Sequence, residues 1–334
     1  EIFKIYAEAL DGKLNIITGK KESGKSHLSK LLAANLAELG APIIIFDLND
    51  EYKGLAKNKN GTASNLSRKI TRLVPGKSLK FNLQYLELNC LCNILTHSLQ
   101  LPGASLREFI RIFRLLKMKN SLNMDELRNH IFNWKGNEFV RDALISRFHT
   151  LQSTGILTDN NNSIKLEELL NTQPDGNITI ISLSEASPLL RRITVEIILS
   201  KLVNLLEKKD IKPVFLFAEE AHLYLRDTYW DDIITRMRHF GIFTTFITNQ
   251  PDAIDQGIYR QADNIFLFNF TNDTDIELVS KASMVDADTV KSIVRTLPSK
   301  NCLVLGKTVN DLPVVVKISQ SKWHAMGETK LFFN

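Results

Sequence analysis

A complete phosphate-loop motif, G-x-x-x-x-G-K-[ST], occupies residues 19–26 and reads Gly19-Lys20-Lys21-Glu22-Ser23-Gly24-Lys25-Ser26. An apolar run, Leu14–Thr18, precedes the motif, and a helical stretch, His27–Leu39, follows it. A strand would therefore lead into a tight turn whose consecutive backbone N–H groups point at an anion. The alternative is a glycine-rich surface turn, which does not require a strand before it and a helix after it. The motif predicts a site for a nucleoside triphosphate.

The residue types in the loop predict how ATP and Mg²⁺ would be held. Gly19 and Gly24 supply backbone freedom, so that the main chain can wrap closely around the phosphates. Lys25 would bridge the β- and γ-phosphates, and the Ser26 hydroxyl would bind Mg²⁺. The predicted nucleotide-binding residues of the loop and the following helix turn are Gly19, Lys20, Lys21, Glu22, Ser23, Gly24, Lys25, Ser26 and His27.

The composition is that of a globular protein, with 44% hydrophobic and 24% charged residues over 334 positions. That length accommodates one large α/β domain or two ordinary ones. The longest apolar candidate, Ile193–Leu206, is interrupted by Glu196 and Lys201, so it predicts an amphipathic helix and not a membrane span. The N-terminus does not resemble a signal peptide, and we expect a cytoplasmic protein without membrane contact.

Neither charge nor cysteine content identifies a partner. The net charge of +5 is compatible with nucleic acid but does not point to it, because many unrelated enzymes are as basic. The three cysteines, Cys90, Cys92 and Cys302, lack zinc-ligand spacing. We interpret them as small buried residues in a reducing compartment.

Short apolar runs bounded by turn residues predict eight strands. Most are continuous and not alternating, which is typical of strands buried on both faces of a parallel sheet. Helical stretches separate most of them, as in an α/β protein. The predicted strands are Leu14–Thr18, Pro42–Asp47, Asn177–Leu183, Val214–Ala218, Ile242–Thr248, Asn264–Phe270, Cys302–Gly306 and Pro313–Ile318.

Helix periodicity replaces strand signals between about Leu99 and Leu170. One helix face would carry five apolar residues, and two further helices would span Met124–Phe132, with Asn123 or Asp125 near its start, and Glu138–Gln152. The predicted division is therefore a core, residues 1–98 and 171–334, and a helical insertion, residues 99–170. The five residues are Leu106, Phe109, Ile110, Phe113 and Leu116.

A second acidic motif follows the predicted strand Val214–Ala218 and begins with Glu219-Glu220. Glu219 would reach the Mg²⁺ shell, and Glu220 would orient the water that attacks the γ-phosphate. Two acids can also simply stabilise a helix N-terminus. In a chain that already carries a phosphate loop, the pair favours a hydrolase over a phosphotransferase to a small acceptor.

Two further polar positions flank the predicted strand Ile242–Thr248. A side chain of Asn249 or Gln250, at its end, could sense the γ-phosphate. Arg238, before it, could reach the nucleotide of a neighbouring subunit and stabilise transition-state charge. Taken alone, either position is more often a solvated surface group.

Together these motifs resemble the HerA branch of the HerA/FtsK superfamily of ring-forming, DNA-translocating ATPases. The resemblance runs through nearly the whole chain, and the combination of motifs is specific although the phosphate loop is generic. Besides that loop, the matching segments are Ile45–Tyr52, Arg72–Asn82, Glu219–His222, Arg238–Gly241, Thr248–Pro251 and His324–Thr329.

The resemblance implies a RecA-like (ASCE) P-loop NTPase with a mostly parallel central sheet flanked by helices. It implies a homo-oligomer, a hexameric ring, that hydrolyses ATP at subunit interfaces and moves double-stranded DNA. It suggests Asp47 and Glu51 as supports of the active site, Glu220 as the catalytic glutamate and Arg238 as a finger supplied in trans. The C-terminal segment would pack near the nucleotide, on the same chain or on a neighbour.

The sequence departs from the family pattern at three places. Relatives commonly carry T-Q-x-P where this chain has Thr248-Asn249-Gln250-Pro251, so Asn249 stands at the sensor position with Gln250 beside it. Asp50 stands where a glycine is expected before Glu51. Only 18 residues precede Gly19, so we expect the family's N-terminal β-barrel to be missing. In the family that barrel mediates docking of partners, so the resemblance does not fix a nuclease partner for this chain. A nuclease or other effector protein is an open possibility as partner.

DNA-contacting residues are not identified by the sequence. Contact with the DNA backbone needs Lys, Arg and N–H groups without base readout. Lys57 and Lys59 lie in or beside a polar loop, and one face of the first insertion helix is basic, although a solvated helix surface is the ordinary explanation. The basic residues of that face are Arg107, Arg111, Arg114 and Lys117.

The sequence is compatible with three functions. The leading hypothesis is an ATP-driven DNA translocase or helicase-like motor. The second is a nucleotide-dependent oligomeric scaffold or signalling ATPase of a defence or mobile-element complex. A small-molecule kinase is the third, and Glu219-Glu220 disfavours it.

Overall fold

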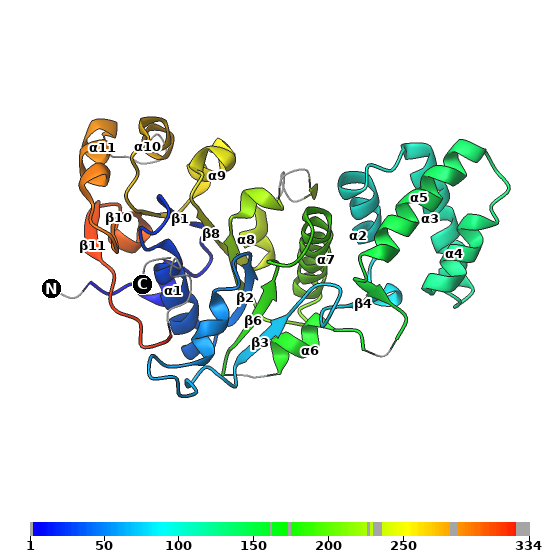
Figure 1. Cartoon of the computed structure of the whole chain (residues 1–334), viewed down its shortest axis with the longest axis horizontal. Coiled ribbons are helices and arrows are strands. Elements are labelled where there is room, and N and C mark those ends of the chain that lie inside the picture. The colour runs from blue at the N-terminus through cyan, green and yellow to red at the C-terminus, as the bar shows by residue number, and fades with distance from the viewer. Residues whose placement is uncertain are drawn as a thin grey trace, which may run out of the picture.

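Nine strands form one sheet in the computed structural model of the chain, which describes residues 3–160, 162–172, 175–225, 228–229, 236–280 and 286–324 (Figure 1). Their order across the sheet is β11-β10-β9-β1-β8-β7-β2-β6-β3. Strands β9 to β3 of this order run parallel, and β10 and β11 continue the sheet with antiparallel pairings. The strands are β1 (Asn15–Thr18), β2 (Pro42–Asp47), β3 (Ile70–Leu73), β6 (Asn177–Ser182), β7 (Val214–Glu219), β8 (Ile242–Thr248), β9 (Asn264–Leu267), β10 (Asn301–Gly306) and β11 (Val314–Lys317).

All eight predicted strands are present, and the prediction of a mostly parallel α/β sheet is confirmed. Strand β3 was not predicted, because it lies at the sheet edge and its middle residues, Thr71 and Arg72, are exposed. An edge strand of this kind lacks the continuous apolar run of a doubly covered strand. Two short strands, β4 (Phe81–Asn82) and β5 (Leu157–Thr158), pair in a separate small sheet.

Apolar side chains alternate between two cores, one on each face of the large sheet. Ile43 and Ile45 of β2 face the core beneath helix α1, whereas Ile44 and Phe46 face the core that continues into the helical part. Both faces of the central strands are therefore covered. The helices are α1 (Lys25–Glu38), α2 (Leu88–Asn93), α3 (Gly103–Met118), α4 (Met124–Phe132), α5 (Glu138–Ser153), α6 (Leu166–Asn171), α7 (Pro188–Glu207), α8 (Met237–Phe240), α9 (Gln256–Gln261), α10 (Asp273–Ser280) and α11 (Ala287–Thr296).

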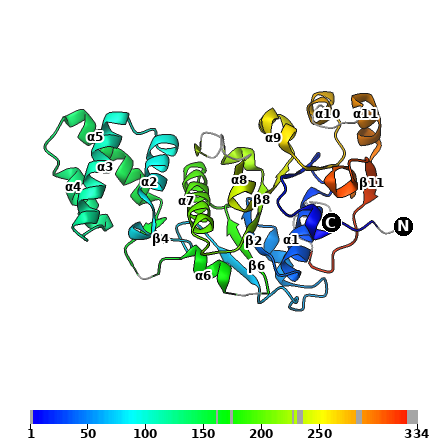
Figure 2. The ribbon, with the colours of Figure 1, turned by 180° about the vertical axis from the view of Figure 1, so that it is seen from behind.

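Helices α2 to α5 lie at one end of the molecule beyond α7, and β10 and β11 lie at the other end (Figures 1 and 2). The three predicted helices between residues 99 and 170 are present as α3, α4 and α5. Asn123 caps α4, since its side chain accepts a hydrogen bond from the Glu126 N–H. On α3, Ile112 is buried where Ile110 was expected, and Ile110 is half-buried. The boundaries of the two parts stay a prediction.

Helix α7 differs from the amphipathic helix predicted for Ile193–Leu206. It packs between the sheet and the helical part, so even Glu196 and Lys201 are buried. The Lys201 ammonium group pairs with Glu87 at 2.8 Å and lies 3.9 Å from the centroid of the Tyr85 ring. Lys201 thus makes its polar contacts inside the molecule, and one Glu196 carboxylate oxygen accepts a 3.5 Å hydrogen bond from the Ser200 hydroxyl.

Two other predictions from composition can be compared with the fold. Within the described ranges, no helix combines the length and the hydrophobicity needed to span a bilayer. Cys90 and Cys302 are buried as expected, whereas Cys92 is half-buried.

Candidate active site

Polar side chains end four neighbouring strands of the sheet. Strands β1, β8, β7 and β2 are adjacent, and their last residues are Thr18, Thr248, Glu219 and Asp47. Because these strands run parallel, their carboxyl ends meet at one edge. The phosphate loop leaves the sheet at that same edge, directly after β1. The fold therefore joins the two motifs that lie far apart in the sequence.

The phosphate loop is held by hydrogen bonds within itself and by the segment that directly follows β9. The Lys25 ammonium group donates to the Lys20 carbonyl at 2.9 Å, and the Ser23 hydroxyl donates to the same oxygen at 2.8 Å. The Lys20 N–H donates to the Asn269 carbonyl at 2.8 Å. A Cβ atom added to Gly19 would lie 2.4 Å from the Phe268 Cβ, so only glycine allows this close approach.

Asp47 and Glu51, which were predicted as supports, both lie beside α1. Asp47 is buried, and its carboxylate accepts the N–H groups of Glu51 and Tyr52 at 3.1 and 3.0 Å. Glu51 pairs with Lys30 of α1 at 2.9 Å. Burial raises the pKa of Asp47, and the two N–H donors oppose that rise. These contacts tie the end of β2 to the helix that begins at the phosphate loop.

Glu219 is fully enclosed at the end of β7. Neither carboxylate oxygen has a well-formed hydrogen bond to a described residue. Burial, and then the charges of Asp47 and Glu51, raise the pKa of Glu219 well above its usual range. A buried carboxylate without hydrogen bonds is costly unless a cation or donor joins it.

Tyr52 is a site residue to which sequence reasoning assigned no role. Its buried hydroxyl shares a 2.6 Å hydrogen bond with Ser29 of α1, and its contact with Glu219 opposes the rise in the pKa of that carboxyl group. Only the fold reveals this, because Ser29, Tyr52 and Glu219 come from three separate segments.

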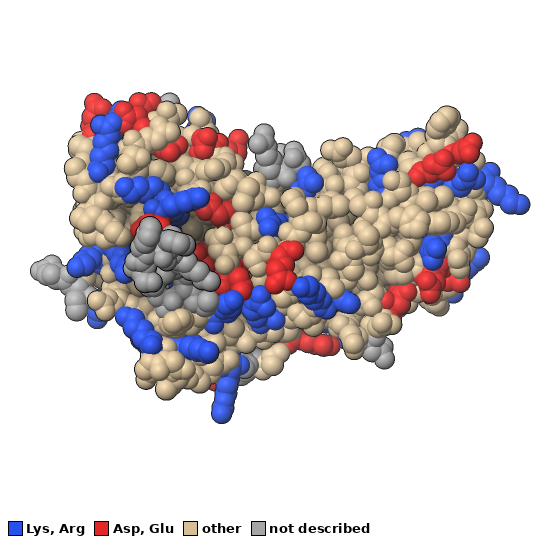
Figure 3. Space-filling view, viewed as in Figure 1, with Lys and Arg blue, Asp and Glu red and all other residues tan. Residues whose placement is uncertain are grey.

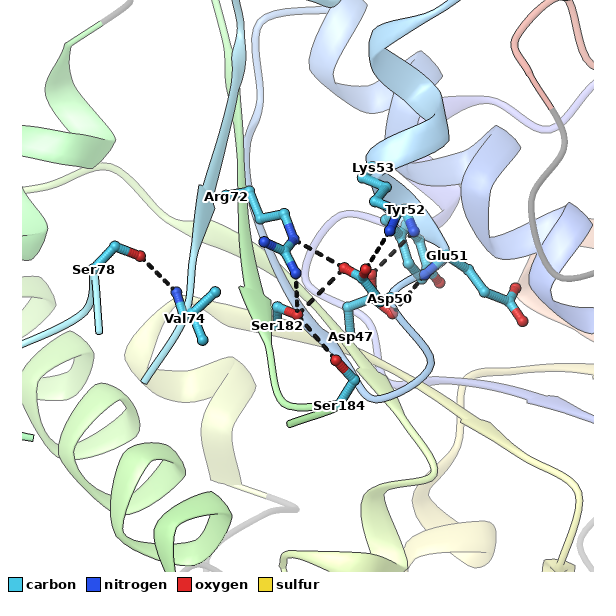
Figure 4. A network of polar contacts seen from close by, with 10 residues as sticks. All are labelled: Asp47, Asp50, Glu51, Tyr52, Lys53, Arg72, Val74, Ser78, Ser182 and Ser184. Carbon is cyan, nitrogen blue, oxygen red and sulfur yellow. Dashed lines mark hydrogen bonds and ion pairs between the residues drawn. The ribbon is translucent and has the colours of Figure 1, made fainter. Parts of the chain in front are cut away.

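The unexpected Asp50 has a structural explanation. It adopts φ +57°, the left-handed region that favours glycine but that Asp and Asn tolerate better than most residues. Its carboxylate pairs with Arg72 of β3 at 2.8 Å, and the Ser182 hydroxyl of β6 donates to it at 3.3 Å (Figure 4). In the same view Glu51 extends away from this cluster. Asp50 thus bridges strand ends where a glycine would form no side-chain contact.

Glu220 also has left-handed backbone angles, φ +47° and ψ +46°. One carboxylate oxygen lies 3.4 Å from both the Thr248 hydroxyl and the Asn249 N–H, and 3.7 Å from His222 Nδ1. Burial lowers the pKa of His222, and the charge of Glu220 opposes that effect. Strained backbone at a charged residue is a recurrent feature of functional sites.

The sensor candidates therefore lie beside Glu220. Asn249 meets it through a backbone N–H, whereas Gln250 is exposed and contacts the Thr248 hydroxyl with its backbone. The fold thus places the backbones of both residues beside the acidic motif.

Arg238 lies near the amino ends of the parallel strands, whereas the phosphate loop lies at their carboxyl ends. Its guanidinium group pairs at 3.1 Å with Asp263, which directly precedes β9 and also accepts the Leu14 N–H before β1. Both strands start at this edge and run towards the loop. Within one chain, Arg238 is therefore apart from the other candidate residues.

The C-terminal segment returns to α1 on its own chain. His27 Nε2 lies 2.8 Å from the Ser319 carbonyl, and the Trp323 side chain is buried in the core that includes Tyr52 and Leu55. Burial lowers the pKa of His27, and the charges of Lys300, Lys30 and Lys59 add to that effect.

The described part of the C-terminal segment ends at His324. Residues 325–329 of the closing motif lie outside the described residues.

The donor set fits Mg²⁺ bound together with a nucleotide. Among the described residues no group of three or more His, Cys, Asp and Glu side chains could hold a metal alone. Mg²⁺ is commonly bound through one or two protein oxygens, several waters and substrate phosphates. The enclosed carboxylate of Glu219 and the half-buried Ser26, the first hydroxyl after Lys25, suit that arrangement.

Comparison with known proteins identifies the family. The family model of the helicase HerA central domain matches residues 17–202, more than half of the chain. The chain belongs to the HerA family. The HerA match includes the phosphate loop, β2, the helical part and most of α7.

Curated relatives of this HerA-family chain are remote in sequence but similar over most of its length. The DNA double-strand break repair helicase HerA of Saccharolobus solfataricus is 22% identical over 364 residues, covering 98% of this chain and 69% of that protein. The probable helicase MJ1565 of Methanocaldococcus jannaschii is 23% identical, with 97% and 66% covered. The chain thus spans about two thirds of the length of these relatives.

Solved structures confirm the RecA-like P-loop fold. VirB4 of Thermoanaerobacter pseudethanolicus superposes with a TM-score of 0.69 at 14% identity, covering 92% of this chain and 89% of VirB4. The bacterial conjugative coupling protein TrwB gives a TM-score of 0.67 at 13% identity, covering 98% and 91%. At such identities the similarity concerns the fold. Family and fold together make the HerA-family chain a P-loop ATPase.

Proposed function

We propose that this chain is an ATP-driven motor that translocates double-stranded DNA. The observation that carries the proposal is the pairing of the phosphate loop after β1 with Glu219-Glu220 at the end of β7, in a chain of the HerA family. The relatives named as helicases support the DNA part of the proposal.

In this proposal the loop N–H groups and Lys25 hold the triphosphate of ATP. The Lys25 ammonium group exchanges its bond with the Lys20 carbonyl for bonds to the β- and γ-phosphates. Ser26 and Glu219 hold Mg²⁺, which neutralises charge on the phosphates when it is bound. Ser29 and Tyr52 position Glu219, and Asp47 and Glu51 position the start of α1.

Glu220 orients and polarises the attacking water. Its charge acts on Lys25, so the two side chains share one electrostatic environment. Thr248 and the Asn249 N–H contact its carboxylate, which couples the water-positioning group to the sensor segment at the end of β8. Asn249 and Gln250 are both proposed sensors of the γ-phosphate.

A ring completes the site in this proposal. Arg238 lies at the sheet edge away from the nucleotide of its own chain, so it can serve catalysis only from a neighbouring subunit. An arginine supplied in trans stabilises charge in the phosphoryl-transfer transition state. The proposed assembly is a homo-hexamer, with a nuclease or other effector as a further proposed partner.

Lys57, Lys59 and the basic face of α3 are the candidate contacts with DNA. On the face shown in Figure 3, Lys and Arg side chains are interspersed with Asp and Glu, and acidic groups gather over α10 and α11. Arg111 of the α3 candidates pairs with Glu108 at 2.8 Å.

The proposal is tested by ATPase assays with and without duplex DNA. We expect duplex DNA to stimulate hydrolysis several-fold, and added salt to weaken the stimulation because DNA binding releases counterions. The proposal would be overturned by a rate of ATP hydrolysis that is the same with and without duplex DNA, in a protein that stays monomeric when an ATP analogue and duplex DNA are both present. Assembly on nucleotide without DNA stimulation would favour the scaffold hypothesis.

The protonation of Lys25 predicts that ATP binding depends on pH. Burial lowers the pKa of Lys25 to about 8, against the attraction of Glu220 and Glu219. The free protein therefore loses this charge as the pH rises through 8, whereas bound phosphates favour the charged form. We expect affinity for a non-hydrolysable ATP analogue to fall above pH 8, by up to roughly tenfold per pH unit.

Calorimetry in buffers of different ionisation enthalpy measures the corresponding proton uptake. Uptake on binding is expected to rise from about 0.1 proton at pH 7 to about 0.9 at pH 9. Affinity and uptake that do not change over this range would contradict the assignment of Lys25 to the phosphates.

A further inference from the structure

The turn before β10 contacts the phosphate loop, although it lies about 275 residues away in the chain. The Lys300 N–H donates to the Ser23 carbonyl at 2.8 Å, and the Ser299 hydroxyl donates to the Glu22 carbonyl at 3.3 Å. A Cβ atom added to Gly24 would lie 3.1 Å from the Lys300 Cα. The main chain of Lys300 therefore adjoins the part of the loop that precedes Lys25.

The turn is anchored on both sides. Asn269, whose carbonyl accepts the Lys20 N–H of the loop, donates its side-chain amide to the Arg295 and Leu297 carbonyls, each at 3.0 Å. On the other side, the Lys300 carbonyl accepts the Ile318 N–H at 2.8 Å, where the C-terminal segment begins. These bonds connect the turn to the segment that follows β9, to the end of α11 and to the segment that reaches His27.

Lys300 combines backbone angles that favour glycine with a positively charged side chain. Its φ is +61°, in the left-handed region where lysine is uncommon, yet a lysine stands beside the phosphate loop. Its side chain is exposed, and none of the described residues forms an ion pair with it. Its charge acts on the His27 ring, which belongs to the first turn of α1. The Lys300 side chain is thus near enough to the first turn of α1 for its charge to act there.

We propose that Lys300 is a further nucleotide-binding residue of this chain, whose ammonium group contacts the polyphosphate of ATP while its backbone supports the phosphate loop. This inference rests on the proposed ATP site. A flexible ammonium group suits a phosphate as a point charge, and a charge-assisted hydrogen bond of this kind is among the stronger polar contacts. Lys300 would add a second positive charge to that of Lys25, from a separate segment.

The test separates the side chain from the backbone. Lys300→Gly removes the ammonium group and keeps the left-handed turn, so the support of Ser23 is retained. Lys300→Arg keeps a positive charge. Lys209→Gly is a matched control, because Lys209 is also exposed and has a left-handed backbone, with φ +62°. It lies between α7 and the start of β7, at the amino ends of the parallel strands and away from the phosphate loop.

The measured quantity is the dissociation constant of the full chain for a non-hydrolysable ATP analogue with Mg²⁺. Lys300→Gly is expected to weaken binding about 10-fold or more, whereas Lys300→Arg stays within about 3-fold of wild type. The weakening should shrink as salt screens the charge. Lys209→Gly is expected to bind like wild type.

Wild-type affinity in Lys300→Gly would overturn the inference. If that variant unfolds at a lower temperature than wild type without nucleotide, Lys300→Asn, which also tolerates the left-handed region, replaces it in the same test. Loss of binding in Lys25→Ala together with unchanged binding in Lys300→Gly rejects only this inference. Unchanged binding in Lys25→Ala rejects the proposed ATP site itself.

Discussion

Replacing Lys25 with alanine is expected to reduce ATP hydrolysis by at least about 1,000-fold in kcat/KM, because charge stabilisation at transferring phosphates is worth several kcal/mol. Lys25 is buried at the start of α1, and the charges of Glu220, Glu219 and Glu51 all act on it. Steady-state ATPase assays measure this loss, together with weaker binding of an ATP analogue.

The control for this prediction is Lys208→Ala, at the exposed end of α7. Its turnover should match that of wild type. A Lys25→Ala variant that folds normally and retains more than about a tenth of wild-type kcat/KM would contradict the assignment of the phosphate loop.

Exchanging Glu220 for glutamine is expected to stop hydrolysis while leaving nucleotide binding intact. The amide keeps the shape of the side chain and can still accept the Thr248 and Asn249 hydrogen bonds, but it no longer polarises water. We expect kcat to fall by roughly 100- to 10,000-fold, the usual contribution of a positioned general base. Binding of the ATP analogue should stay within about threefold of wild type.

Binding and turnover must therefore separate in Glu220→Gln, unlike in Lys25→Ala. Glu207→Gln, at the exposed end of α7, is the matched control and should retain full activity. If Glu220→Gln hydrolyses ATP at half the wild-type rate or faster, then Glu220 does not position the water, and the acidic motif needs another interpretation.

Much of the fold could be predicted because its strands are short and buried on both faces. Ile43 to Phe46 form a continuous apolar run, and the structure buries alternate residues of that run in two separate cores. Strand β3 could not be recognised, because an edge strand with exposed Thr71 and Arg72 resembles a loop. Helix α7 was recognised, but its buried Glu196 and Lys201 depend on packing against residues far away in the chain.

The candidate site was predicted where local motifs determine the chemistry. The phosphate loop and Glu219-Glu220 each have a fixed order of residues after a strand, so their types alone indicate a role. Tyr52, Thr248 and Lys300 were not assigned roles, because their contacts depend on how the strands order across the sheet and on a turn near the C-terminus. The location of Arg238 at the amino ends of the strands likewise could not be predicted without the fold.

The central claim, that ATP hydrolysis by this chain moves it along duplex DNA, is tested most directly by triplex displacement. A labelled third strand is bound to a duplex, and its release is followed with ATP, with a non-hydrolysable analogue, and with the Glu220→Gln variant. We predict release that requires ATP, takes longer as the duplex track lengthens, and is absent with the analogue or the variant. Robust ATP hydrolysis without release of the third strand from tracks of either polarity would contradict the account.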